Sequence, residues 1–195
     1  MSNIVTQKAE LRGEALTRRD ALSPEDRAQA AETIAARAFP LAVVGKVVSG
    51  FMSLKSELNP LPLMRKLAEA GATLALPAID GRGKPLIMRA YAFGDELARG
   101  QWGIREPKPE AADVAPDILL VPLAAFDRRG QRIGYGAGYY DMTIRALRAK
   151  KNVTAIGIAF AVQEIDRVPA TDHDEHLDVV LTERETIDFR ANKES

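Results

Sequence analysis

The chain has 195 residues and no cysteine, and its 27 lysine and arginine residues equal its 27 aspartate and glutamate residues. The absence of thiols excludes cysteine nucleophiles, thiolate zinc sites and disulfides, and the balanced charge gives no electrostatic support for binding nucleic acid or a membrane surface. The length fits one domain over residues 1–195, and 46% hydrophobic content is enough for a sizeable core.

The N-terminal segment has no composition typical of targeting. No apolar run approaches the roughly 20 residues of a membrane helix, and the first residues lack the continuous apolar core of a secretion signal. Glu10, Glu14 and Asp20 argue against a transit peptide. The cytoplasm is therefore the expected location.

Helical and strand patterns alternate along the chain. This alternation predicts an α/β fold with a central parallel or mixed sheet flanked by helices. Residues 94–109, rich in glycine and proline, are expected to form a loop. Helices are expected over 4–21, 23–39, 61–70 and 139–150, and strands over 43–52, 73–77, 85–91, 117–122, 153–160 and 179–182.

Cations share one face of the first expected helix. Lys8 and Arg12 are four residues apart, and Arg19 lies two turns further along the same face. By itself this pattern is typical of a solvated helix face. A nucleotide site without its own lysine would, however, need cations from another element, so both interpretations stay open.

A glycine-rich loop at 132–141, RIGYGAGYYD, leads into the expected helix at 139–150. Gly134, Gly136 and Gly138 can take positive φ and let the backbone approach a ligand, and a helix N-terminus favours anions. The loop does not match GxGxxG, because Tyr139 stands where the third glycine would fall, and it lacks the Walker pattern. The spacing alone fits a phosphate loop or a tight strand-to-helix connection.

Asp141 favours a nucleotide site with magnesium. A carboxylate in the first helical turn is a favourable partner of the helix dipole. Beside a phosphate it would repel, unless a divalent cation lies between them. Arg132 is favoured for contact with phosphate or carboxylate over Arg128 and Arg129, which are expected in solvent.

A second group of candidate ligands lies at 172–178, DHDEHLD. His173 and His176 are three residues apart, a spacing that puts them on one helix face and suggests a zinc site. No third histidine or thiolate exists, and the HExxH pattern is absent. The oxygen ligands here suit magnesium better.

The chain resembles the 5-formyltetrahydrofolate cyclo-ligases, also called 5,10-methenyltetrahydrofolate synthetases. The resemblance implies a fold like that of the NagB/RpiA/CoA-transferase-like proteins. Some members carry basic residues in the glycine loop where this chain has Tyr135 and Ala137, so the positive charge must come from elsewhere. The resemblance is carried by RIGYGAGYYD with the preceding VPLAAFDRRGQ, by KAELR at 8–12, FMSLKSE at 51–57, WGIREP at 102–107 and PATDHDEHLDVVLTE at 169–183.

The resemblance implies conversion of 5-formyltetrahydrofolate to 5,10-methenyltetrahydrofolate, with ATP and Mg²⁺ as cofactors and ADP and phosphate released. The formyl oxygen would be phosphorylated, and N10 would close the ring. The small-molecule folate, with or without a polyglutamate tail, is the expected partner, and a monomer is expected.

The resemblance also implies a role for each matching residue. Arg132 and Tyr140 would be catalytic, Asp141 and Asp174 would hold the metal, and Glu57 would accept hydrogen bonds from the pterin ring. The ATP-binding set would be Lys8, Arg12, Arg132, Ile133, Gly134, Tyr135, Gly136, Ala137, Gly138, Tyr139 and Tyr140, and the folate-binding set Met52, Glu57, Trp102, Tyr135 and Tyr139.

Two other functions remain open from the sequence. One is a sugar-phosphate isomerase or CoA-transferase-like enzyme, whose glycine loop would hold phosphate without ATP or metal. The other is a non-catalytic folate or nucleotide-binding module. Two features argue against a binding module: the two acids expected to hold the metal, Asp141 and Asp174, and the Lys8 and Arg12 pair. A protein that only binds has no use for γ-phosphate chemistry.

Overall fold

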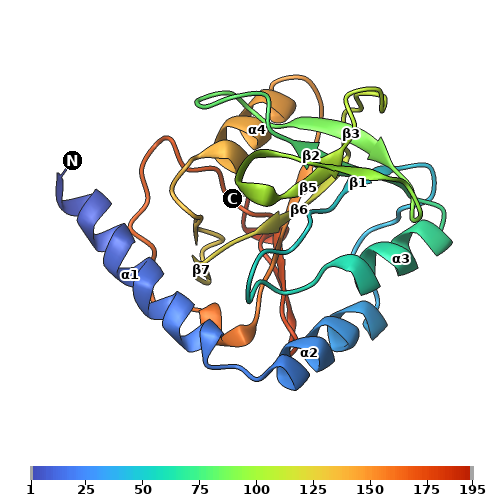
Figure 1. Ribbon diagram of the computed structural model, residues 1–195. Coiled ribbons are helices and arrows are strands. Elements are labelled where there is room, and N and C mark those ends of the chain that lie inside the picture. The colour runs from blue at the N-terminus through green and yellow to red at the C-terminus, as the bar shows by residue number, and fades with distance from the viewer. Residues whose placement is uncertain (1, 194–195) are drawn as a thin grey trace.

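The computed structural model describes residues 2–193, and the side chains of Ser2, Trp102, Asn192 and Lys193 lie outside what it describes. Within that range seven of the strands form the main sheet, in the order β11-β10-β9-β6-β1-β2-β3 (Figure 1). The five inner strands are parallel, and the edge strands β11 and β3 are antiparallel. The predicted α/β class is confirmed. The strands are β1 Val47–Ser49, β2 Thr73–Ala78, β3 Ile87–Tyr91, β6 Ile118–Pro122, β9 Thr154–Ile158, β10 Val179–Leu181 and β11 Thr186–Asp188.

The helices are α1 Ser2–Asp20, α2 Pro24–Ala36, α3 Leu61–Glu69 and α4 Tyr139–Arg148. Helix α2 begins as its sequence predicts, because the Ser23 side chain accepts a hydrogen bond from the Asp26 N–H at 3.0 Å. It ends at Ala36, earlier than predicted. Arg37 is extended, and its guanidinium donates to the carbonyls of Thr182 and Glu183 instead.

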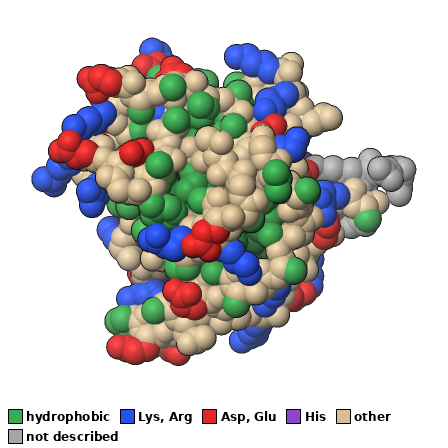
Figure 2. Space-filling model, turned by 90° about the vertical axis from the view of Figure 1, so that its right-hand side faces the viewer, with side chains coloured by type: hydrophobic (Ala, Val, Ile, Leu, Met, Phe, Trp, Pro, Cys, Tyr) green, Lys and Arg blue, Asp and Glu red, His purple; other side chains and the backbone are tan. Residues whose placement is uncertain are grey.

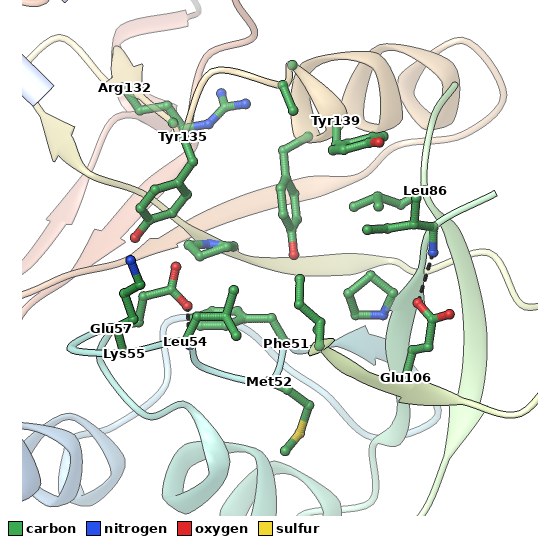
Figure 3. Close-up of a pocket in the computed structure, with 18 of the residues that line it drawn as sticks. Phe51, Met52, Leu54, Lys55, Glu57, Leu86, Glu106, Arg132, Tyr135 and Tyr139 are labelled. Carbon is green, nitrogen blue, oxygen red and sulfur yellow. Dashed lines mark hydrogen bonds between the residues drawn. The ribbon is translucent and has the colours of Figure 1, made fainter. Parts of the chain in front are cut away.

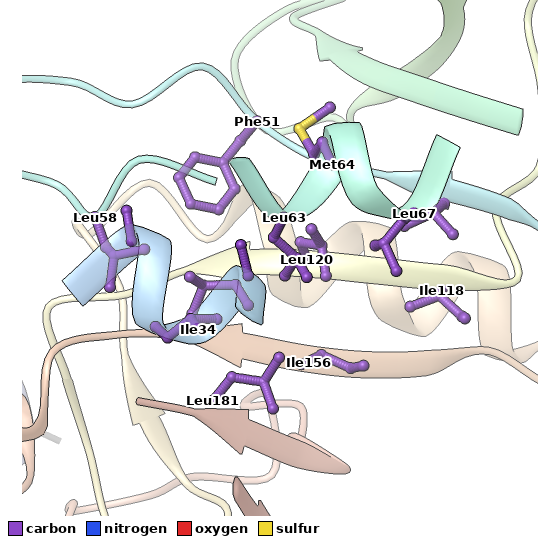
Figure 4. Close-up of a cluster of buried hydrophobic side chains, with 14 of the residues drawn as sticks. Ile34, Phe51, Leu58, Leu63, Met64, Leu67, Ile118, Leu120, Ile156 and Leu181 are labelled. Atoms are coloured by element: carbon purple, nitrogen blue, oxygen red, sulfur yellow. The ribbon is translucent and has the colours of Figure 1, made fainter. Parts of the chain in front are cut away.

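Each face of the sheet carries its own core. Residues of β6 alternate between the faces, as the two-residue period of a strand requires. Ile118 and Leu120 pack with α2 and α3 on one face (Figure 4), while Leu119 and Val121 pack with Ile144 of α4 on the other.

Two segments differ from the sequence prediction. The strand expected over 43–52 is only β1, because Gly45 turns the chain before it at φ 69° and the backbone at Gly50 passes against α3. A Cβ at Gly50 would lie 2.2 Å from Met64 Sδ. The loop expected over 94–109 is instead a hairpin of β4 Leu97–Arg99 and β5 Arg105–Pro107 around the 3₁₀ turn Gln101–Gly103. Such short strands are too brief to show an alternating pattern.

The sheet has its topological switch point between β1 and β6. These strands are neighbours, but from β1 the chain continues to β2 on one side, and from β6 it continues to β9 on the other. Open α/β sheets bind ligands at the carboxyl ends of strands beside such a point. A second small hairpin, β7 Ala125–Phe126 and β8 Arg132–Ile133, follows β6 and delivers the chain to the glycine loop.

Helix α1 lies along the outer edge of the molecule (Figure 1). Leu11 and Ala15 pack on a small cluster of Ala125, Ile133 and Val168. Among its described side chains, those that are buried are Ala15 and, unusually for a charged residue, Arg19.

On the face shown in Figure 2, charges of both signs are interspersed around a central region of hydrophobic side chains. This face therefore offers no patch of a single sign of the kind that binds nucleic acid. No helix in residues 2–193 is long and apolar enough to cross a membrane.

Candidate functional site

A cavity of about 440 Å³ opens at the switch point. Phe51 and Met52 line it after β1, Pro77 lines it from β2, and Pro122 lines it from the end of β6. Its size is in the range of small-ligand sites. The residues predicted for the site that line it are Met52, Glu57, Arg132, Gly134, Tyr135, Ala137, Gly138, Tyr139, Tyr140 and Asp141.

The glycine loop forms one wall of this cavity and has the geometry that favours anions. Gly136 and Gly138 have φ of 101° and 70°, which strongly favours glycine, while φ of Gly134 is not positive. Gly138 is the N-cap of α4, and no side chain of the described residues caps that helix. The first turn of α4 therefore presents its N–H groups and the positive end of its dipole at the cavity.

Arg132 is buried where the glycine loop begins, with 5% of its surface exposed. Its guanidinium donates to Asp141 Oδ1 at 2.8 Å and to the carbonyl of Glu175, whose N–H in turn donates to Asp141 Oδ1 at 3.0 Å. These bonds fix a positive charge in the cavity wall. They also join the glycine loop to residues 171–176.

Two cations of α1 reach the same region from outside the cavity. Lys8 Nζ donates to both carboxylate oxygens of Asp174 at 2.7 and 2.6 Å, and Arg12 Nε donates to the carbonyl of Gly134 at 2.7 Å. Burial alone would raise the pKa of Asp174, but Lys8 and the bonds from Thr171 outweigh it and hold that pKa below its usual value. Lys8, Arg12 and Asp174 do not line the cavity in the described structure, so their predicted phosphate and metal contacts stay predictions.

Glu57 is a partly buried carboxylate on the opposite wall. Burial is the largest influence on its pKa and raises it; bonds from the Leu54 N–H at 2.7 Å and from the Tyr135 hydroxyl, together with the charge of Arg19, oppose that rise without cancelling it. Figure 3 shows the Tyr135 hydroxyl directed at Glu57. A carboxylate in this setting suits a ligand that carries N–H donors.

Tyr140 is a neutral phenol in the cavity wall. Burial, followed by the negative charge of Glu57, raises its pKa well above the usual value. Its hydroxyl is therefore protonated at neutral pH and can donate a hydrogen bond to a ligand.

Ile133 and Trp102 were also predicted for the site. The Ile133 side chain is 1% exposed and packs with Ala15, so only its backbone could serve a ligand, and its carbonyl already accepts the Ala124 N–H at 2.8 Å. The backbone of Trp102 lies in the 3₁₀ turn of the β4–β5 hairpin, and its side chain lies outside the described structure. Its stacking role stays a prediction.

Within residues 2–193 no group of three or more His, Cys, Asp or Glu side chains has the arrangement of a metal site. His176, considered for zinc, contacts the Gln131 amide, with Nε2 at 2.9 Å. Arg128 and Arg129 are exposed, as expected, and each also pairs with an acid: Arg128 with Glu164 and Arg129 with the buried carboxylate of Asp127.

Sequence reasoning missed several polar residues of the cavity region, among them Arg19, Glu106 and Ser56. Arg19 and Glu106 line the cavity, and Glu106 accepts the Ile79 N–H at 3.1 Å. Ser56 contacts Arg19. The signal for Arg19 was its place on the helix face shared with Lys8 and Arg12, but spacing cannot show burial.

Comparisons with known proteins identify the family to which the chain belongs. The model of the 5-formyltetrahydrofolate cyclo-ligase family matches residues 4–183. The chain is 34% identical over 173 residues to the 5-formyltetrahydrofolate cyclo-ligase of Escherichia coli K12, covering 85% of this chain and 94% of the relative. It is 33% identical over 189 residues to that of Mycolicibacterium smegmatis, covering 92% and 95%.

A solved structure, the 5,10-methenyltetrahydrofolate synthetase of Aquifex aeolicus, superposes with a TM-score of 0.77 and 29% identity, over 94% of this chain and 93% of that one. The family match over residues 4–183 includes the strands of the main sheet up to β10, the glycine loop and the residues that line the cavity. The chain belongs to the 5-formyltetrahydrofolate cyclo-ligase family.

Proposed function

We propose that the chain converts 5-formyltetrahydrofolate to 5,10-methenyltetrahydrofolate in a reaction that consumes ATP and requires Mg²⁺. The observation that carries this proposal is that one cavity holds two kinds of binding group. A helix N-terminus with buried Arg132 suits phosphate, and the partly buried Glu57 carboxylate suits a ring with N–H donors. A phosphoryl donor and a folate would therefore meet in a single site.

The folate end of the cavity would be set by Glu57. Its ionised carboxylate accepts from the amino and ring N–H groups of the pterin, which fixes the ring's orientation. Met52, Tyr135 and Tyr139 line the cavity around it and supply apolar and aromatic surface. We place Trp102 on the same ligand, from the β4–β5 hairpin.

The chemistry needs an oxygen that can leave. The formyl group on N5 is amide-like, so its oxygen leaves poorly until it is phosphorylated. The formyl oxygen attacks the γ-phosphorus of ATP and ADP departs; N10 then adds to the formyl carbon, its proton passes to the phosphate, and phosphate leaves as the ring closes. For such transfers a protein chiefly positions groups and neutralises charge.

Arg132 and Tyr140 are the side chains that we assign to the reacting groups. Arg132 is held rigid in the cavity wall, so its charge is already in place when negative charge builds on the transferred phosphoryl group. Tyr140, kept protonated by burial, can donate to a phosphate oxygen. N10 can attack as a neutral amine, so this route requires no general base.

The residues present fit a magnesium ion that is bound mostly by phosphate oxygens. Such ions typically take one or two protein carboxylates and complete their shell with phosphates and water. Asp141 lines the cavity and Asp174 lies beyond it in a neighbouring segment, and both of the bonds to Asp141 described above use Oδ1. When bound, the metal neutralises phosphate charge and orients the γ-phosphoryl group.

The test is the absorbance of the methenyl product when purified protein meets 5-formyltetrahydrofolate, with ATP and Mg²⁺ each present or omitted. We expect product only when both are present. Product without ATP would reject the phosphoryl-transfer proposal. If protein shown to be folded gave no product under any condition, the isomerase and the binding module would become the favoured alternatives. Monomeric state and cytoplasmic location stay predictions from the sequence.

A further inference from the structure

Arg19 has a buried position that the proposed chemistry does not yet use. It lines the cavity from the last turn of α1 with 4% of its surface exposed. Burying a guanidinium is costly unless its N–H groups are bonded. Arg19 Nε donates to Ser56 Oγ at 3.0 Å, Arg19 Nη1 donates to Tyr135 Oη at 2.6 Å, and Ser56 in turn donates to Asp20.

Tyr135 connects this arginine to the folate side of the cavity. The guanidinium carbon of Arg19 also lies 5.8 Å from the centre of the Tyr135 ring. Because its oxygen accepts from Arg19, the hydroxyl proton is free to be donated. The Leu123 carbonyl is 3.4 Å away, a long contact, whereas the Glu57 carboxylate is a charged and therefore stronger acceptor.

From this geometry we infer that Arg19 is a positioning residue of the site, acting through Tyr135 to hold Glu57 ionised and oriented for the folate. This inference rests on the proposed function. Arg19 belongs to α1, Tyr135 to the glycine loop, and Glu57 to the segment after β1. The chain Arg19–Tyr135–Glu57 thus sets the phosphate loop and the folate carboxylate in fixed relation to one another.

The arrangement also explains how the cavity gains positive charge from outside the glycine loop. Arg132 supplies one buried guanidinium from the loop itself. Arg19 of α1 supplies a second one from outside the loop, at the Glu57 end of the cavity. Other charged or titratable groups line the same cavity, and of these Tyr140 interacts with Glu57. They are Asp20 of α1, Lys55 of the Glu57 segment, Arg105 and Glu106 of β5, and Arg132, Tyr139, Tyr140 and Asp141 of the opposite wall.

The sign of the pH effect follows from these contacts. Burial raises the pKa of Glu57, while Arg19 and the Tyr135 hydroxyl lower it. Folate binding needs the ionised form, so activity falls as pH drops through that pKa. Removing Arg19 takes away a lowering influence, and the acid limb of the pH profile should move to higher pH.

The test compares Arg19→Met, Arg19→Lys, Tyr135→Phe and the Arg19→Met/Tyr135→Phe double variant. Arg18→Met is the matched control, because Arg18 is exposed and donates to the Val162 carbonyl away from the cavity. We expect Arg19→Met to lower kcat/KM for the folate by at least about tenfold, as for the loss of a hydrogen bond to a charged group. Its acid limb should move up in pH, and Arg18→Met should match the wild type.

The other variants separate positioning from a structural role. Arg19→Lys keeps the charge and should keep the limb near its wild-type position. Tyr135→Phe should move the acid limb of the pH profile to higher pH. The double variant should lose much less kcat/KM, expressed as free energy, than the sum of the two single losses, since both substitutions break one chain of contacts. A fall in kcat/KM with an unmoved limb, or additive losses, would overturn the inference.

A readout independent of turnover keeps this inference separate from the proposed function. The Glu57 carboxyl carbon can be titrated by NMR in ligand-free protein labelled with ¹³C-glutamate, assigned with Glu57→Gln. Its pKa should be higher in Arg19→Met and Tyr135→Phe than in wild type; equal values would overturn the inference. A wild-type protein without cyclo-ligase activity would instead contradict the proposed function.

Discussion

Asp141 shows how one carboxylate can serve both the resting protein and the proposed metal. Its Oδ1 accepts from Arg132 and from the Glu175 N–H, which aligns the glycine loop with residues 171–176. Asp141→Asn keeps an oxygen acceptor for these bonds but removes the negative charge that a hard cation prefers.

We expect Asp141→Asn to raise the Mg²⁺ concentration for half-maximal turnover by about tenfold or more, the scale seen when metal sites lose a supporting carboxylate. The measurement is turnover against Mg²⁺ at saturating ATP and folate. Asp188→Asn is the control, because this half-exposed acid pairs with Arg190 at the sheet edge. A large loss of turnover with an unchanged Mg²⁺ requirement would show that Asp141 acts only on Arg132.

The sequence predicted which residues lie together better than it predicted their contacts. Glu57, Arg132 and Asp141 line one cavity, and their roles there stay predictions. Lys8 contacts Asp174, a pairing across 166 positions that no local pattern encodes. Arg19 was visible only as a charge on a helix face, since its burial depends on Tyr135 and Ser56, which come from distant segments.

Among the elements, β9 depends on a glycine for its packing. Gly157 lies in the middle of this strand, and a Cβ there would lie 2.7 Å from Leu177 Cδ1 and 2.8 Å from Leu123 Cδ2. Real Cβ atoms do not tolerate such distances, so neighbouring side chains or the strand would have to move.

Gly157→Ala should therefore lower the free energy of unfolding by about 1–3 kcal/mol, the usual cost of overpacking a core. Urea denaturation followed by circular dichroism measures this. Gly13→Ala is the matched control, because a Cβ at this helical position meets nothing within 4 Å and alanine favours the helix. If Gly157→Ala were as stable as wild type, the packing described for β9 would be wrong.

Long, strongly patterned elements were predictable, whereas of the short strands β10 was predicted and several others were not. Helices α1, α3 and α4 and strand β6 lie close to where period and caps put them. Strands β4, β5 and β11 have three residues each and were not predicted. Three residues are too few to show the two-residue period of a strand. Whether such a segment forms a strand depends on the neighbouring strands with which it pairs.

In the whole molecule, the chain order of β1, β2, β6 and β9 creates the switch point, and the cavity lies at the carboxyl ends of the strands there. The α/β class followed from the alternation of elements. The strand order did not, because each parallel crossover can pass to either side of the sheet. The family resemblance supplied the expected fold that alternation alone left open.

The proposed mechanism requires this cavity to bring a phosphoryl donor to the formyl oxygen of a folate. The most direct test is to react the protein with ATP, Mg²⁺ and 5-formyltetrahydrofolate that carries ¹⁸O in its formyl group, and to analyse the released phosphate by mass spectrometry. We predict that each phosphate carries the formyl ¹⁸O, since that oxygen leaves bonded to phosphorus. Methenyl product accompanied by unlabelled phosphate, with the ¹⁸O recovered in water, would contradict the proposed mechanism.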